Sequence, residues 1–224
     1  MDSKFSLIID FDSTIISLET LELLGSISLE GNEQKDNIIK QVSHYTDLAM
    51  NGDITFQESL NLRLKLLQIH NNHINKIIKE LKCFIDQSFL QNIDFFKENL
   101  NNTYVVSGGF KSIINSTLLN STNLNWNIFA NEFEFNNKGY ITGVNQDTPL
   151  AFSKGKVELV KKLNLNNDVI VIGDGYTDYE VKKYGLAKYF LAYTAYAERK
   201  NVIKEADQTC KNFNQVIDFI TNNY

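Results

Sequence analysis

Hydrophobic positions divide the chain into two kinds of segment. Short, nearly continuous apolar runs occupy residues 4–9, 103–106, 168–172 and 188–193, and several of them end in glycine or aspartate. Between them lie longer segments in which apolar residues recur at helical spacing. Such runs are typical of strands buried on both faces, and their alternation with helices predicts an α/β fold with a parallel sheet covered on both sides.

The helical spacing continues without a strand from residue 17 to residue 83. Thr55 and Glu58 form a capping box within this stretch, which marks the start of one helix. Because strand-bearing segments lie on both sides, the stretch predicts a helical cap inserted after the first strand. We expect a core domain made of residues 1–16 and 84–224, and a cap domain made of residues 17–83.

Two shorter segments carry weaker patterns. Residues 127–144 alternate between apolar and polar positions and contain the turn sequence NNKG, which predicts a β-hairpin that would form a small flap. Residues 205–210, EADQTC, show neither period and are expected to be irregular.

Composition narrows the class of protein. The 224 residues are 43% hydrophobic and 22% charged, which allows a sizeable core. A net charge of −5 without a basic run argues against a nucleic-acid surface. No apolar run reaches the roughly 20 residues of a membrane span, and Cys83 and Cys210 lack metal-site spacing. We expect a soluble, cytoplasmic protein with reduced thiols, and the sequence leaves its oligomeric state open.

Carboxylates gather where two of the predicted strands end. Asp10 and Asp12 follow the first strand, and Asp174 and Asp178 follow the run at residues 168–172. Ligands of such sheets bind at the carboxyl ends of the strands, so these side chains should crowd one edge. Like charges there would repel each other, and a hard divalent cation such as Mg²⁺ would relieve the repulsion while leaving positions for water and phosphate.

Other strand ends supply groups suited to a phosphoryl group. Ser107 offers a hydroxyl, Gly108 and Gly109 let backbone N–H groups approach closely, and Lys154 offers a point charge. A carboxylate facing a phosphoryl group can act as its nucleophile, and a second carboxylate two residues later can act as acid and base. The alternative interpretation of the two aspartates is a capped loop before a helix.

The sequences DFDST, VVSGGF, SKGK and GDGYTD, in that order, resemble the four motifs of the haloacid-dehalogenase (HAD) superfamily, most closely its phosphoserine phosphatase branch. The resemblance covers residues 5–206. It implies a doubly wound, HAD-like Rossmannoid core with a helical cap. It also implies an Mg²⁺-dependent phosphomonoesterase that serves serine biosynthesis by hydrolysing O-phosphoserine to serine and phosphate through an aspartyl-phosphate intermediate.

The resemblance also implies roles at the reacting phosphorus, with Asp10 as nucleophile and Asp12 as acid and base. The implied catalytic residues are Asp10, Asp12, Ser107 and Lys154. The implied metal site comprises the side chains of Asp10, Asp174 and Asp178 and the backbone carbonyl of Asp12. Lys154 is preferred to Lys156 because the lysine of the family directly precedes the glycine, and Lys156 is expected to be solvated.

The cap would supply the contacts to the rest of the substrate. By the resemblance, Glu19 meets the substrate ammonium, Arg63 in FQESLNLR meets its carboxylate, and Met50 and Phe56 close over it. The full predicted substrate set is Glu19, Met50, Phe56, Arg63, Ser107, Gly108, Gly109 and Thr177. Glu19 could instead be an ordinary first-turn glutamate, and Arg63 a surface arginine.

Two departures from the family pattern leave the substrate open. Thr177 stands where many phosphoserine phosphatases carry asparagine, and the segment containing Tyr193, Tyr196, Glu198 and Arg199 differs from the family's shorter ending. This segment could reshape the pocket. The alternatives are a HAD phosphatase or phosphotransferase acting on another small phosphate ester, and a non-catalytic phosphate-binding module.

Overall fold

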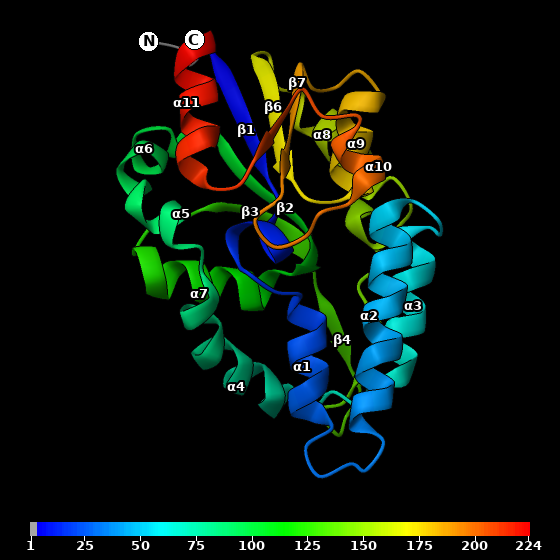
Figure 1. Cartoon of the computed structure of the whole chain (residues 1–224). Helices are drawn as coiled ribbons and strands as arrows, with labels where there is room; N and C mark the ends of the chain where they lie inside the picture. The colour runs from blue at the N-terminus through cyan, green and yellow to red at the C-terminus, as the bar shows by residue number, and fades with distance from the viewer. Residues whose placement is uncertain (1–3) are drawn as a thin grey trace.

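A six-stranded parallel sheet forms the centre of the computed structural model, which describes residues 4–224 (Figure 1). The strand order is β3-β2-β1-β6-β7-β8, and every neighbouring pair is parallel. The strands are β1 (Phe5–Ile9), β2 (Thr103–Phe110), β3 (Asn127–Asn131), β6 (Asp168–Gly173), β7 (Tyr189–Tyr193) and β8 (Gln208–Cys210). The predicted doubly wound α/β fold is confirmed.

Side chains of the strands alternate between two hydrophobic cores. Leu7 and Ile9 of β1 belong to one core and Ile8 to the other. Helices α5 (Gln87–Gln91), α6 (Ile93–Glu98), α7 (Lys111–Thr122) and α11 (Phe213–Asn223) cover the first core, and α8 (Gly155–Leu163), α9 (Tyr176–Lys183) and α10 (Lys200–Ile203) cover the second. Burial on both faces explains why the strands read as continuous apolar runs. Within residues 4–224, no helix is both long and apolar enough to cross a lipid bilayer.

The topology creates a crevice between β1 and β6. The chain proceeds outward from β1 through β2 to β3, and then returns to β6 on the other side of β1. In sheets of this kind the ligand site lies at such a reversal, outside the carboxyl ends of the strands. Asp10 follows β1, Asp174 follows β6, and Asp10 N donates to Ile172 O at 2.9 Å. The fold therefore brings the two acidic strand ends together.

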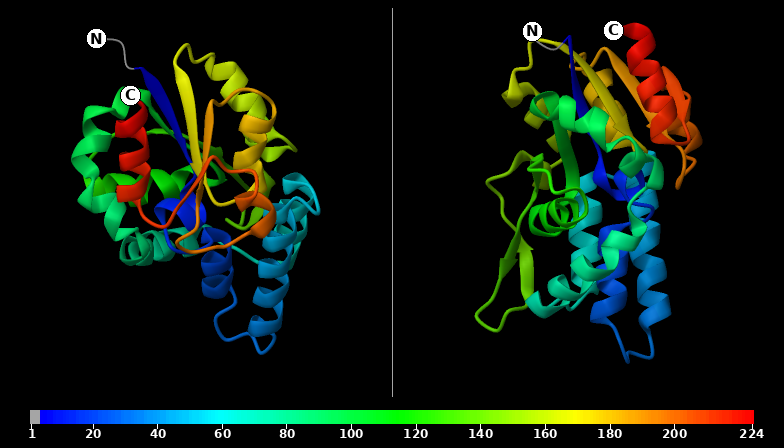
Figure 2. Two further views of the ribbon diagram at one scale, coloured as in Figure 1. Left: turned by 45° about the horizontal axis from the view of Figure 1, so that its top comes forward. Right: turned by 90° about the vertical axis from the view of Figure 1, so that its left-hand side faces the viewer.

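Four helices form an insert between β1 and β2: α1 (Thr20–Ser28), α2 (Lys35–Asn51), α3 (Phe56–Leu66) and α4 (Asn71–Leu81). They extend beyond the carboxyl end of the sheet, away from the chain termini (Figures 1 and 2). The two crossings to the core are paired, since Ile16 and Ile85 form an antiparallel bridge and Ser17 N donates to Phe84 O at 2.9 Å. The predicted boundaries fall at this crossing, where we propose that a helical cap is hinged to the core.

Two short segments differ from the sequence prediction. Residues 127–131, expected to be half of a hairpin, form β3 and pair with β2 in the main sheet, so the hairpin consists only of β4 (Phe133–Phe135) and β5 (Ile141–Val144). Residues 208–210, expected to be irregular, form the edge strand β8 on β7. Both strands are short and depend on a neighbouring strand rather than on their own pattern.

Candidate active site

An irregular turn directly after β1 positions the two motif aspartates. Phe11–Ile15 form a π-helical turn, and Ser13 within it has a left-handed φ of 52°. The turn closes with a hydrogen bond from Ile16 N to Phe11 O at 3.0 Å. Asp10 Oδ1 accepts from Phe11 N at 2.7 Å, which orients the carboxylate at the end of the strand.

A buried lysine connects Asp10 with the loop after β6. Lys156 Nζ lies 2.8 Å from Asp10 Oδ2 and 2.7 Å from Asp178 Oδ1, and all three side chains are buried. Burial alone would lower the pKa of Lys156, but the two carboxylates outweigh it and hold that pKa above its usual value. The ammonium beside Asp10 therefore remains charged.

The expectation that Lys156 is solvated is wrong, because its side chain is buried, whereas the choice of Lys154 for the phosphoryl group stays a prediction. Lys154 is the residue before α8 and has a left-handed φ of 59°, and its exposed ammonium lies 4.8 Å from the centre of the Tyr184 ring. Lys156, in the first turn of α8, instead reaches Asp10. Lys154 borders the cavity, but Lys156, which was expected to be solvated, places its charge in the site.

Three carboxylates from the two strand ends form a candidate metal centre. Asp10, Asp174 and Asp178 are buried and place one oxygen each within 4.8 Å of one another. Asp178 is also fixed by a hydrogen bond from Gly175 N to its Oδ2 at 3.2 Å. A β-carbon on Gly173 would lie 2.2 Å from Asp178 Cγ, so the glycine provides the space that this carboxylate occupies. An all-oxygen set from few carboxylates fits Mg²⁺.

Arg199 pairs directly with Asp174, through an ion pair between Nη1 and Oδ2. Burial raises the pKa of Asp174, and the Arg199 guanidinium opposes that increase. The sequence had marked the segment around Arg199 as a departure from the family pattern. The structure places one end of that segment at the candidate metal centre.

Asp12 is hydrogen-bonded through one oxygen and leaves the other to the cavity. Thr20 donates to Asp12 Oδ1 through its hydroxyl and through its backbone N at 3.2 Å. Asp12 Oδ2 lies 3.3 Å from where a β-carbon of Gly109 would stand. Burial first, and then the charge of Glu19, raises the pKa of Asp12 well above its usual value. A carboxyl group whose pKa is raised holds its proton more strongly, which suits a general acid.

The end of β2 forms the wall beside Asp12. Ser107 is buried, and its hydroxyl oxygen accepts a hydrogen bond from Gly109 N at 3.0 Å. A β-carbon on Gly108 would lie 2.4 Å from Phe56 Cζ, so only glycine allows the Phe56 ring of α3 to approach the strand this closely. The hydroxyl and the backbone N–H groups at this strand end can donate hydrogen bonds to the oxygens of a phosphoryl group.

The helical insert contributes charges of both signs to the same cavity. Glu19 Oε1 accepts a hydrogen bond from Ser13 Oγ at 2.8 Å. Arg63 is only 4% exposed and donates through Nη1 to Thr46 Oγ1 at 3.2 Å, with its guanidinium carbon 5.8 Å from the centre of the Phe56 ring. Burial lowers the pKa of Arg63, while Glu19 and other acidic neighbours oppose the decrease.

These groups line one cavity of about 650 Å³, including its mouth, between the sheet and the insert. Every predicted site residue borders it except Asp178, which lies against Lys156. The sequence prediction missed several lining residues and one supporting residue: Leu21, Leu60, Phe110, Leu150, Phe152, Gly155, Lys156 and Thr20. The apolar members lie on amphipathic segments, where the pattern cannot distinguish a cavity wall from the core.

Several known proteins are similar to this chain in sequence or in fold. The chain is 29% identical over 212 residues to the chloroplastic phosphoserine phosphatase of Arabidopsis thaliana, covering 93% of this chain and 69% of that protein. It is 31% identical over 185 residues to the phosphoserine phosphatase of Lactococcus lactis, covering 80% and 79%. A phosphoserine phosphohydrolase-like protein from Francisella tularensis superposes with a TM-score of 0.86 at 28% identity, covering 96% and 99%. No protein-family model matches the chain.

Proposed function

The chain belongs to the phosphoserine phosphatase branch of the HAD superfamily and is a phosphoric monoester hydrolase, and we propose that it hydrolyses O-phosphoserine to serine and phosphate with Mg²⁺. The observation that carries the proposal is a buried acidic triad whose member Asp10 contacts Lys156, in a cavity also lined by Glu19 and Arg63. As the sequence predicts, the reaction would serve serine biosynthesis in the cytoplasm.

Asp10 is oriented to act as the nucleophile. Phe11 N holds one carboxylate oxygen and Lys156 the other, so the group cannot rotate away from the strand end. Lys156 and the backbone N–H groups around Gly109 would attract the phosphoryl oxygens. Asp10, Asp174 and Asp178 would hold Mg²⁺, and the bound cation would supply neutralisation of the negative charge of the phosphoryl group.

Asp12 is placed to move the proton in both half-reactions. Its free Oδ2 gives a proton to the serine oxygen as the bond from phosphorus to that oxygen breaks and Asp10 becomes phosphorylated. The resulting Asp12 carboxylate then takes a proton from water, which attacks phosphorus, releases phosphate and restores Asp10. Thr20, bonded to Oδ1, keeps Asp12 in one orientation through both steps.

The helical insert closes over the reacting groups through contacts at glycines of the core. The ring of Phe56 lies on Gly108, and a β-carbon on Gly175 would lie 2.6 Å from Met50 Sδ. These contacts bring apolar surface against both strand ends and exclude water from the aspartyl-phosphate until the insert opens.

Glu19 and Arg63 match the two charged ends of an amino acid. We expect Arg63→Ala to raise KM for O-phosphoserine about 100-fold, because the substrate carboxylate would lose its pairing with a buried guanidinium. For an aryl phosphate, which has no such carboxylate, KM should change less than about threefold, since the phosphoryl contacts remain. Steady-state kinetics on both substrates measure the difference.

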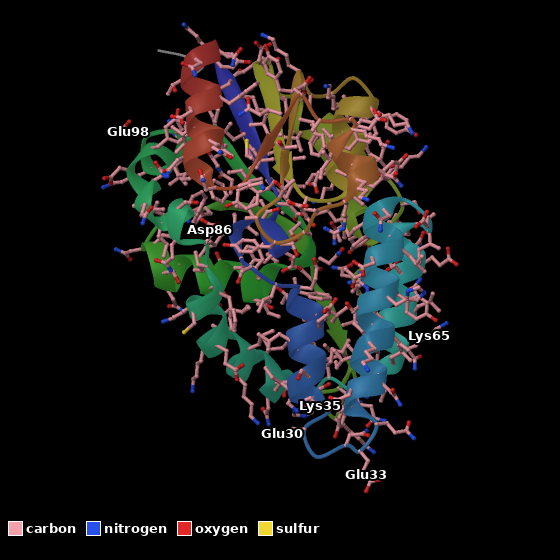
Figure 3. All side chains as sticks on the ribbon, in the orientation of Figure 1. Glu30, Glu33, Lys35, Lys65, Asp86 and Glu98 are labelled. Carbon is pink, nitrogen blue, oxygen red and sulfur yellow. The ribbon has the colours of Figure 1, made fainter. Side chains whose placement is uncertain are left out.

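Lys65→Ala is the matched control for Arg63→Ala. Lys65 lies on the same helix, is exposed and lies on the outer side of the insert in Figure 3, so its removal should leave both KM values unchanged. Circular dichroism should show that both variants keep the helical content. Equal loss on both substrates in Arg63→Ala would remove the amino-acid assignment and leave a general phosphatase.

The acidic centre predicts how metal and pH affect stability. Burial raises the pKa values of Asp12, Asp174 and Asp178, that of Asp178 from 3.8 to about 7. At pH values between the pKa of the unfolded chain and that of the folded protein, the folded protein binds more protons than the unfolded chain. Its stability is therefore lost as pH rises through this range. We expect the metal-free protein to melt at least about 3 °C lower at pH 8 than at pH 6.

Mg²⁺ should oppose this loss, because the cation replaces the protons that the carboxylates release. The increase in Tm on adding Mg²⁺ should therefore be larger at pH 8 than at pH 6. Thermal unfolding in EDTA and in Mg²⁺ at both pH values measures it. An equal increase at both would mean that the cation binds away from these carboxylates.

A further inference from the structure

Arg199 forms an ion pair with one carboxylate oxygen of the candidate metal centre. Its Nη1 pairs with Asp174 Oδ2, and Arg199 is only 8% exposed. Its Nε is buried without a hydrogen-bond partner among the described residues. A guanidinium with one unsatisfied nitrogen is not fully accommodated where it lies, because an unpaired buried donor is costly. The arginine therefore occupies a position that it can leave.

A second carboxylate is available to the same guanidinium. Arg199 Nη2 lies 3.8 Å from Asp47 Oδ1 on α2 of the insert, and the Asp47 side chain is 65% exposed. The guanidinium thus lies between a buried aspartate of the core and a solvated aspartate of the insert. A small movement would strengthen the second ion pair at the expense of the first.

The loop that carries Arg199 is held firmly at its base. Tyr193 and Tyr196 donate to Asp86 Oδ2 at 2.5 and 2.6 Å, and Asp86 N donates to Ile15 O at 2.9 Å. Figure 3 shows Asp86 at the level where the sheet meets the insert. Because the loop is anchored to the core, Arg199 is held beside Asp174, and movement is confined to its side chain.

We propose that Arg199 is a displaceable internal counter-ion of the metal centre: it occupies Asp174 before the cation binds and moves toward Asp47 when the cation takes that oxygen. The inference rests on the proposed metal site. It follows that Arg199 competes with the cation, so it weakens metal affinity, and that Asp47 assists metal binding by receiving the displaced guanidinium. Metal loading would then strengthen a contact between the core and α2.

The test is isothermal titration of Mg²⁺ into metal-free protein without substrate. Arg199→Gln should lower the Kd for Mg²⁺ about tenfold, because the cation no longer displaces a charged partner. Asp47→Asn should raise the Kd about threefold, in keeping with its exposure. In the double variant the effect of Asp47→Asn should disappear. Lys200→Gln, the same loss of charge at the exposed neighbouring residue, should leave the Kd unchanged.

The outcomes separate this inference from the metal site itself. A higher or unchanged Kd in Arg199→Gln would overturn it, since Arg199 would then orient Asp174 or do nothing for the metal. If Arg199→Gln does not fold, Arg199→Lys, which keeps the charge but can pair with only one carboxylate, should give a Kd between wild type and the tenfold decrease. Mg²⁺ binding of wild-type strength in Asp174→Asn would show that the site is misplaced, and would overturn both proposals.

Discussion

Asp10→Asn is expected to reduce phosphate release from O-phosphoserine by at least ~10⁴-fold, because an amide oxygen cannot form the aspartyl-phosphate. The protein should remain folded. Asparagine has the same shape, its carbonyl can still accept from Phe11 N, and Lys156 keeps its ion pair with Asp178. Phosphate release under saturating substrate and Mg²⁺, with thermal unfolding of the same sample, measures both expectations.

The Tm of Asp10→Asn shows whether its loss of activity comes from the missing nucleophile or from a destabilised fold. Asp10 is one of three buried carboxylates whose oxygens lie within 4.8 Å of one another, so its neutralisation removes repulsion as well as one ion pair. We expect the metal-free Tm to remain within about 3 °C of wild type. Asp53→Asn makes the same chemical change at an exposed position and should keep full activity. Wild-type turnover by Asp10→Asn would refute the nucleophile assignment.

The chemistry of the site could be predicted because it stands at strand ends. The apolar run of β1 stops at Asp10, and that of β6 leads to Asp174, so the topology of a parallel sheet is enough to bring the two together. The insert could be predicted for a similar reason, since helical spacing over a long stretch without a strand excludes other interpretations. These signals are local, and the fold only has to align them.

Features that depend on tertiary contact could not be predicted. Strand β8 has three residues and exists because β7 offers an edge with free backbone groups. Strand β3 was joined to the hairpin because Glu132 alone separates β3 from β4, and no turn sequence marks the boundary between them. Arg199 was noticed only as part of an unusual segment, because the ion pair with Asp174 joins residues from different loops.

For the two lysines of SKGK, too, the sequence pattern does not predict which side chain reaches the site. The sequence offers two cations separated by one glycine, and spacing alone cannot say which one faces the sheet. The left-handed backbone of Lys154 turns its side chain toward Tyr184, whereas Lys156 follows the first turn of α8 back to Asp10. The direction is decided by the backbone at the helix start, which the pattern of residue types does not encode.

This pair of lysines provides the second large prediction. Lys156→Gln should lower kcat/KM about 10²- to 10³-fold, because the site loses the charge beside the nucleophile that would also attract the phosphoryl oxygens. It should also destabilise the metal-free protein by about 3–5 kcal/mol, since Asp10 and Asp178 then face each other without their buried counter-ion. Kinetics and denaturant unfolding measure the two effects.

Lys154→Gln removes the same charge two residues away and is the matched control. Because the Lys154 ammonium is exposed and lies over the Tyr184 ring, its loss should change kcat/KM less than about threefold and leave stability unchanged. The decisive quantity is therefore the ratio of kcat/KM in Lys154→Gln to kcat/KM in Lys156→Gln. If Lys154→Gln were the variant that lost activity while Lys156→Gln kept it, the lysine directly before the glycine would act on the phosphoryl group, and the buried Lys156 would serve only to hold Asp10 and Asp178 together.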